Sequence, residues 1–285
     1  MSEFSGNISD KVPLYTFLGN FGDSLSPYLV KKIANKEVKY LNLGFNNKDR
    51  NDFGYMVVGS IASLAGSSTK VWGSGILDIN LCPNKGAEFF AVRGPITRMW
   101  LEFQGFNVPE IYGDPALLLP LFYNKEVKIK HEIGFIPHYI HSELCKEKFQ
   151  ESFIIDVLGH SGNELDGKIE ATIDKIRSCK LIVSTSLHGI IVAHAYGIPA
   201  IWATFSTSKR KLMGGKWQYM KFQDYYLSVG LMPPKLPLDL SNKRITSNFL
   251  SGLYLKSPKL NINLKDLLDS CPIPKKCAGI IEDLL

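Results

Sequence analysis

Short apolar runs alternate with stretches of helical spacing over residues 12–122. The apolar runs have the length of β-strands and occupy residues 12–18, 55–58, 69–72 and 89–92. The first run leads into a helix in which Pro27 suits the first turn, because that turn needs no backbone N–H. The last run leads into a helix that begins at Pro95, carries apolar residues at helical spacing up to Phe103 and ends at Gly105.

The same alternation resumes after a charged connector at residues 124–132. The strands predicted there are residues 133–136, 153–157, 181–185 and 198–203, and the helices are residues 142–150, 163–178 and 188–196. Such alternation predicts parallel sheets with right-handed crossovers. Two such halves place a ligand cleft between them, at the carboxyl ends of the strands. The predicted fold class is therefore α/β, with two Rossmann-like domains and an interdomain cleft.

This pattern divides the chain into four parts. They are a Rossmann-like domain at residues 1–124, a linker at 125–132, a second Rossmann-like domain at 133–230 and a C-terminal tail at 231–285. The tail is richer in proline, asparagine and lysine, and whether it packs back onto the first domain is left open.

The composition is that of an ordinary globular protein. Of 285 residues, 45% are hydrophobic and 21% are charged, which is enough to bury a core without disulfides or metals. The net charge of +6 suits a small anionic substrate and falls short of a dedicated nucleic-acid-binding protein. The five scattered cysteines predict neither a disulfide framework nor a zinc site. No signal peptide or membrane span is evident, so we expect a cytoplasmic protein, with peripheral membrane contact left open.

Polar residues stand at three strand ends of the first half, where the cleft is expected. Asn20 and Gly22 lie in a tight turn into a helix whose free N–H groups can bind an anion. Asp23 in the same turn orients a sugar hydroxyl, acts as a base or merely caps the helix. Arg93 precedes a helix start, where its guanidinium grips a carboxylate or phosphate, or forms a structural salt bridge. Asp114, directly before a proline, caps a helix or faces the cleft.

In the second half, a histidine stands at a strand end among hydroxyl side chains. His188 opens a helix, which places its ring near any anion bound at the helix N-terminus, although a core histidine with its own partner is the alternative. Ser184 and Ser186 add hydrogen-bond donors beside it. His138 ends the first strand of this half and is either a substrate contact or a plain loop histidine. No residues have the spacing of metal ligands, so no metal site is predicted.

A basic stretch with two glycines follows the last predicted strand, at residues 209–221. Its glycines indicate a loop that closes over an anionic substrate. Because charge runs are usually solvated, we expect only one or two of its basic residues, Lys216 or Lys221, to contact the ligand.

In their order along the chain, these segments resemble the polysaccharide pyruvyl transferase family. The matching pieces are Asn20-Phe21-Gly22-Asp23, Ala91-Val92-Arg93-Gly94-Pro95, Gly113-Asp114-Pro115-Ala116-Leu117-Leu118, Ile136-Pro137-His138-Tyr139, Ser186-Leu187-His188-Gly189, Ala193 with Tyr196-Gly197-Ile198-Pro199, and Lys221-Phe222 with Asp224-Tyr225-Tyr226. Together they span about residues 12–230 and leave the tail uncovered.

The resemblance implies a fold like that of the GT-B glycosyltransferases, with the acceptor on the side of the first domain and the donor on that of the second. It implies phosphoenolpyruvate as the donor, a co-substrate, and no cofactor. The family's essential histidine maps onto His188, its anion-binding arginine onto Arg93 and its early aspartate onto Asp23. Some members have an arginine where this chain has Ser186, so Ser186, Arg93 or the basic loop is expected to supply that donor contact.

The reaction implied is the formation of a pyruvate ketal on a sugar diol of capsule, exopolysaccharide or cell-wall polysaccharide. Such a site must bind a carboxylate and a phosphate, supply a proton and deprotonate hydroxyls. We assign proton transfer to His188. Arg93 is expected to bind the negative charge of the donor, and Asp23 to activate or orient an acceptor hydroxyl. Two other hypotheses stay open: a GT-B glycosyltransferase that uses a nucleotide sugar, and a non-catalytic binding protein of the same fold. The sugar, its hydroxyl pair, its nucleotide or lipid carrier and the oligomeric state are also left open.

Overall fold

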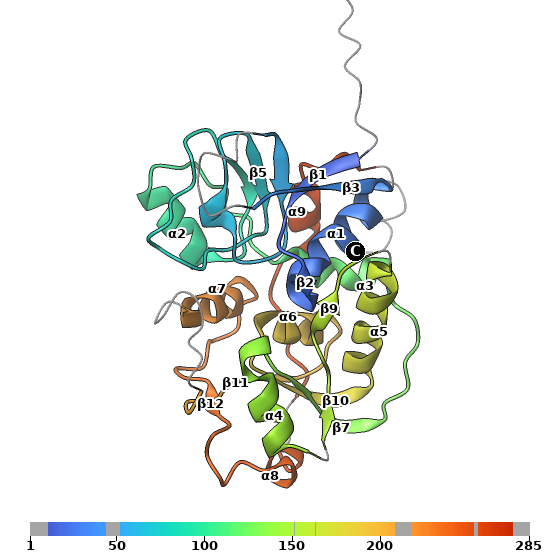
Figure 1. Ribbon diagram of the computed structural model, residues 1–285. Helices are drawn as coiled ribbons and strands as arrows, with labels where there is room; N and C mark the ends of the chain where they lie inside the picture. The colour runs from blue at the N-terminus through green and yellow to red at the C-terminus, as the bar shows by residue number, and fades with distance from the viewer. Residues whose placement is uncertain are drawn as a thin grey trace, which may run out of the picture.

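The computed structural model describes residues 11–43, 52–150, 152–162, 164–208, 218–253 and 256–275, and it contains two separate five-stranded sheets (Figure 1). Every pair of neighbouring strands within these two sheets runs parallel. The prediction of an α/β fold with parallel sheets is therefore confirmed. Because the strands of a parallel sheet all point the same way, the segments that leave their carboxyl ends share one edge, where ligands bind in such folds.

The first sheet has the strand order β3-β1-β4-β5-β6. Its strands are β1 (Lys11–Tyr15), β3 (Glu37–Leu41), β4 (Gly54–Met56), β5 (Thr69–Trp72) and β6 (Glu88–Ala91), with α1 (Phe21–Ala34) after β1 and α2 (Pro95–Phe103) after β6. Strand β3 was not predicted from the sequence, because Val38 is its only buried residue. An edge strand whose other side chains meet solvent lacks the apolar run that marks a buried strand.

The second sheet has the order β12-β11-β10-β7-β8. Its strands are β7 (His131–Ile136), β8 (Phe153–Ile154), β10 (Cys179–Ser184), β11 (Ala200–Thr204) and β12 (Leu238–Asp239), with helices α4 (Ser142–Lys148), α5 (Leu165–Arg177) and α6 (Leu187–Ala195). The remaining described elements are β2 (Gly19–Asn20), β9 (Leu158–His160), the short 3₁₀ helices η2 (Ala62–Leu64), η3 (Pro115–Leu118) and η4 (Tyr139–His141), and helices α3 (Leu119–Phe122), α7 (Met220–Ser228), α8 (Ser247–Ser251) and α9 (Leu264–Asp269). No helix in the described ranges is long and apolar enough to cross a membrane.

Helix α1 begins earlier than the sequence suggested. Pro27 lies in its second turn, not its first, because the helix is capped at Asn20, whose side chain accepts the backbone N–H of Asp23 at 3.0 Å. Proline has no N–H to donate to the carbonyl four residues before it, which is that of Asp23. The Thr16 hydroxyl donates to this carbonyl at 3.0 Å and replaces the missing hydrogen bond. The prediction for Pro27 was wrong because the asparagine cap decides where this helix starts.

Many contacts join the two halves of the molecule, and the following three position the site. Strand β2, at the start of α1, pairs antiparallel with β9 of the second half. Helix α9 returns to the first sheet, where Trp72 Nε1 donates to the carbonyl of Leu267 at 2.8 Å. Helix α7 leaves the second half and packs against α2 of the first. In Figure 1, α6 and α7 accordingly lie between the two sheets.

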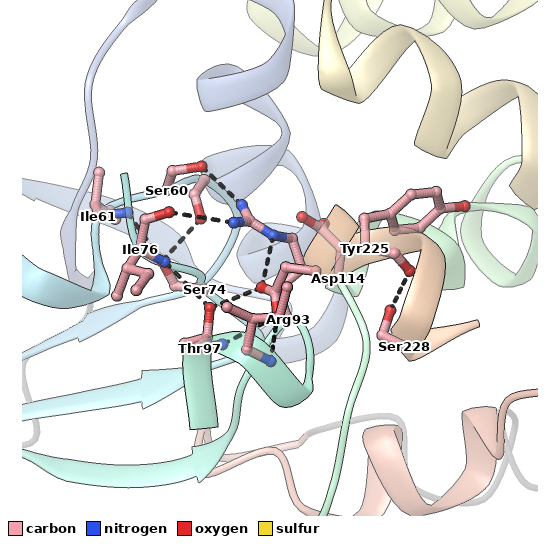
Figure 2. Close-up of polar contacts among 12 residues, drawn as sticks. Ser60, Ile61, Ser74, Ile76, Arg93, Thr97, Asp114, Tyr225 and Ser228 are labelled. Carbon is pink, nitrogen blue, oxygen red and sulfur yellow. Dashed lines mark hydrogen bonds and ion pairs between the residues drawn. The ribbon is translucent and has the colours of Figure 1, made fainter. Parts of the chain in front are cut away.

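A buried ion pair fixes α7 to α2 (Figure 2). Arg93 Nε lies 3.4 Å from Asp224 Oδ2, and both side chains are buried. Asp224 Oδ1 also accepts the backbone N–H groups of Ile96 at 2.9 Å and Thr97 at 3.0 Å. The residue at the N-cap of α2 is Gly94, which has no side chain to cap the helix, so Asp224 supplies the cap from α7. One carboxylate therefore balances a buried charge and completes a helix end.

We expect Asp224→Asn to lower the free energy of unfolding by about 3–5 kcal/mol. Asparagine keeps the shape of the side chain but leaves the buried guanidinium of Arg93 without a counter-charge. Urea unfolding followed by circular dichroism measures the change. Asp269→Asn is the matched control, because Asp269 pairs with Lys265 at the surface, where ion pairs contribute little. A loss from Asp224→Asn no greater than that of the control would contradict this role.

Candidate functional site

A cavity of about 460 Å³ lies where segments from both halves meet. These segments follow β1 and β4 of the first sheet and β7 and β10 of the second, and α7 closes one side. Its polar lining consists of Asn20, Asp23, Ser60, Ser63, Asp78, His138, Tyr139, Ser186, His188 and Lys221. Apolar residues such as Phe17, Leu64 and Leu187 form much of the remaining wall. The structure thus brings together most of the site residues predicted from strand ends.

Asp23 projects from the first turn of α1 toward this cavity. It does not cap the helix, because the cap is Asn20, whose side-chain amide donates to Asp23 Oδ2 at 2.5 Å. Burial raises the pKa of the Asp23 carboxyl above its ordinary value, while His188, Asn20 and Lys221 act in the opposite direction. Asp23 therefore holds a proton to higher pH than a solvated aspartate does.

His188 stands between Asp114 and the start of α1. Its Nε2 lies 3.5 Å from Asp114 Oδ2, and among the described residues neither atom has a hydrogen-bond partner. Gly22 makes room for the other side of the ring, because a Cβ at this position would lie 2.1 Å from His188 Nδ1. With Nε2 buried against a carboxylate, Nδ1 is the ring nitrogen left for a ligand.

Asp114 combines the two roles that its sequence left open. Its Oδ1 accepts the backbone N–H of Ala116 at 3.0 Å and caps η3, while its Oδ2 faces His188. Asp114 does not line the cavity, so it orients the imidazole from behind.

Lys221 brings a positive charge into the cavity from the first turn of α7. Burial lowers the pKa of its ammonium group to about 8, the charge of Arg93 adds to this effect, and Asp23 opposes it. A lysine with this pKa carries its charge at neutral pH and loses it in mildly alkaline solution.

Arg93 lies behind the cavity wall rather than in it. It is fully buried and is absent from the cavity lining. Besides the ion pair with Asp224, its Nη1 donates to Ser60 Oγ at 2.7 Å and its Nη2 to the carbonyl of Ile76 at 3.3 Å (Figure 2). The structural salt bridge considered from the sequence is therefore present. Arg93 acts on the cavity indirectly, because it donates to Ser60 and its charge lowers the pKa of Lys221.

The remaining predicted site residues fall into three groups. His138 and Ser186 line the cavity, and burial lowers the pKa of His138 to about 3, so its ring is neutral at ordinary pH. Ser184 is fully buried and shapes the turn before α6, where its Oγ accepts the N–H of Ser186 at 3.0 Å. Lys216 lies outside the described residues.

Sequence reasoning missed Ser60 and Asp224. Ser60 follows the predicted strand at residues 55–58 by one glycine, so the strand-end argument applied to the other candidates was available for it. Asp224 was quoted only as part of a motif, because no local pattern shows that it pairs with Arg93. Among the described residues, no group of three or more His, Cys, Asp or Glu side chains is placed to hold a metal ion. The absence of a metal from the reaction stays a prediction.

Comparison with known proteins identifies the family. The model of the family described as "Polysaccharide pyruvyl transferase" matches residues 20–206. "Uncharacterized protein L143" of Acanthamoeba polyphaga mimivirus is 31% identical over 215 residues, which cover 74% of this chain and 71% of that protein. The crystal structure of the uncharacterized protein KP1_0663 from Klebsiella pneumoniae has a TM-score of 0.43 at 15% identity, and covers 76% of this chain and 87% of that one. The resemblance seen in the ordered motifs is thereby confirmed, and the chain belongs to the polysaccharide pyruvyl transferase family.

Proposed function

We propose that the protein transfers the pyruvyl unit of phosphoenolpyruvate to two hydroxyls of a sugar, with formation of a pyruvate ketal and release of phosphate. Membership of the family supports pyruvyl transfer in polysaccharide synthesis. The use of phosphoenolpyruvate and the formation of a ketal are proposed mainly because His188, Asp23 and Lys221 line one cavity. It offers an imidazole, a carboxyl group whose pKa is raised by burial and an ammonium group to one small anionic ligand.

The reaction needs one proton donor and two hydroxyl nucleophiles. A proton is added to the methylene carbon of phosphoenolpyruvate, which leaves positive charge on the neighbouring carbon, C2. The first hydroxyl oxygen bonds to C2, and the second does so as the bond from C2 to the phosphate oxygen breaks. One hydroxyl proton replaces the proton that the enzyme gave to the methylene carbon, and the other leaves with phosphate. The enzyme therefore ends in its starting protonation state.

The proton transfers fall to His188 and Asp23. His188 exchanges a proton at Nδ1, because Asp114 holds Nε2 and stabilises the imidazolium when it forms. Asp23, with its raised pKa, exchanges a proton with an acceptor hydroxyl on the side of the first half. These two groups enter the cavity from different halves, which suits a donor and an acceptor that bind on opposite sides.

The negative charges of phosphoenolpyruvate are met mainly from the second half. Lys221 supplies an ammonium group, and the N-terminus of α6 supplies the backbone N–H of Leu187. Ser186 makes no side-chain bond that caps α6 in the part of the chain that the structure describes, and its own N–H already donates to Ser184 Oγ at 3.0 Å. The N–H of Leu187 is therefore the one that this helix end offers to a ligand. We accordingly assign the donor chiefly to Lys221 and α6 of the second half, with polar groups of the first half as further contacts. A sugar acceptor is assigned to the first half, within reach of Asp23, in a cleft arranged as in GT-B enzymes.

We expect the protein to release phosphate from phosphoenolpyruvate only when a suitable sugar acceptor is present. Mass spectrometry of nucleotide-linked and lipid-linked sugars incubated with phosphoenolpyruvate should detect a product with an added pyruvate ketal. The same panel without phosphoenolpyruvate is the control. Release of a nucleotide from a nucleotide sugar in that control, with no ketal in any reaction, would identify a glycosyltransferase instead.

We expect His188→Gln to reduce kcat about 10²–10⁴-fold, the usual contribution of a positioned acid–base group, while the protein stays folded. Glutamine retains polar contacts but cannot exchange the proton. His131→Gln is the control, because His131 stacks on Phe153 at the opposite end of β7 from the cavity. An unchanged kcat in folded His188→Gln protein would remove His188 from the proton transfers.

We expect kcat/KM for phosphoenolpyruvate to fall as the pH rises through about 8, because Lys221 loses its charge there. The group is protonated below this pH, so binding is supported on the acid side and lost on the alkaline side. Lys221→Arg should move the fall to higher pH, since arginine keeps its charge. Lys168→Arg, a change outside the cavity, should leave the profile unaltered. An identical alkaline limb in Lys221→Arg would exclude Lys221 as its source.

A further inference from the structure

We infer that Ser60 donates its hydroxyl proton to an anionic oxygen of the donor substrate, and that Arg93 acts on the substrate through this hydroxyl. Ser60 lines the cavity, whereas Arg93, directly behind it, does not. The inference rests on the proposed function, because the anion is taken to be the carboxylate or phosphate of phosphoenolpyruvate.

Among the residues that the structure describes, the guanidinium of Arg93 has two hydrogen-bond partners and one ion-pair partner, none of them a ligand. Nε faces Asp224 at 3.4 Å, Nη1 donates to Ser60 at 2.7 Å and Nη2 donates to the carbonyl of Ile76 at 3.3 Å (Figure 2). Its flat face is covered by Gly75, where a Cβ would lie 2.2 Å from Arg93 Cζ. A direct contact with a ligand would require Arg93 to abandon buried partners, which is costly for a charged group.

The bond from Arg93 determines what the Ser60 hydroxyl can do. A serine oxygen accepts through its lone pairs and has a single proton to donate. Its oxygen already accepts from Arg93, and the described residues offer its proton no hydrogen-bond acceptor. The proton is therefore available to a ligand in the cavity. A hydroxyl that accepts a bond from a guanidinium is also polarised into a stronger donor.

The turn that carries Ser60 is fixed by the surrounding backbone. Gly59 adopts a φ of +119°, and its carbonyl accepts from Ser74 Oγ and from the N–H of Gly75, each at 2.9 Å. A Cβ on Gly59 would lie 3.4 Å from Asp23 Oδ1, so the turn passes directly beside Asp23. Ser60 thus enters the cavity in a fixed place next to the proposed acid–base group, as a preorganised donor must.

We expect Ser60→Ala to weaken the binding of phosphoenolpyruvate roughly tenfold or more, the usual effect of removing a donor to a charged group. Isothermal titration calorimetry measures Kd for phosphoenolpyruvate, inorganic phosphate and pyruvate with each variant. If only the affinity for phosphate falls, Ser60 donates to the phosphoryl oxygens of phosphoenolpyruvate. If only the affinity for pyruvate falls, it donates to the carboxylate. Ser60→Thr keeps the hydroxyl and should keep the affinity. Ser63→Ala removes a serine of the same cavity wall that is hydrogen-bonded to no guanidinium within the described part of the chain, and it should weaken binding less.

The outcomes separate this inference from the proposed function. The role of Ser60 would be overturned if Ser60→Ala protein with a normal thermal unfolding curve bound all three anions with unchanged Kd values. An equal loss of affinity in Ser63→Ala protein would also overturn it. If the natural protein binds phosphate or pyruvate but not phosphoenolpyruvate, the proposed function fails while those two anions still decide the role of Ser60. If it binds none of the three, both are wrong.

Discussion

The buried ion pair between Arg93 and Asp224 is the constraint on which the rest of the site depends. A guanidinium without contact with water needs a counter-charge, and the one available comes from a helix of the other half of the chain. The same carboxylate caps α2, so α7 cannot move away without exposing both a buried charge and a helix end. Because Lys221 lies one turn before Asp224, this pair also sets where the lysine enters the cavity.

The polar groups of the cavity form two layers. His188, Lys221 and Ser60 line the cavity, and each is held or influenced by a charged residue that does not line it. Asp114 lies behind His188, while Arg93 lies behind Ser60 and lowers the pKa of Lys221. Such buried support fixes the geometry of the donors before the substrate arrives, which is how electrostatic catalysis avoids reorganisation during the reaction. It also explains why residues of both halves are needed for one site.

Much of the fold was predictable because each strand and helix is indicated by the spacing of its own apolar residues. The cavity was predictable in turn, because ligands bind at the carboxyl ends of parallel strands. What was not predictable depends on partners distant along the chain. For Arg93 the sequence left open a substrate contact or a structural salt bridge, and it could not show that Asp224, far along the chain, is its ion-pair partner in the core. For Asp114 the sequence left open a helix cap or a functional role. One of its carboxylate oxygens caps η3 and the other faces His188. The family match ends at residue 206. Lys221, which the basic stretch predicted as a ligand contact, lines the cavity from the first turn of α7.

The most direct test of this account is a crystal structure of the protein with phosphoenolpyruvate. The account predicts the ligand in the cavity, with anionic oxygens within hydrogen-bond distance of Lys221 Nζ and Ser60 Oγ, and its methylene carbon beside His188 Nδ1. Arg93 should remain paired with Asp224. Phosphoenolpyruvate bound away from His188, or Arg93 released from Asp224 to hold the ligand directly, would contradict it.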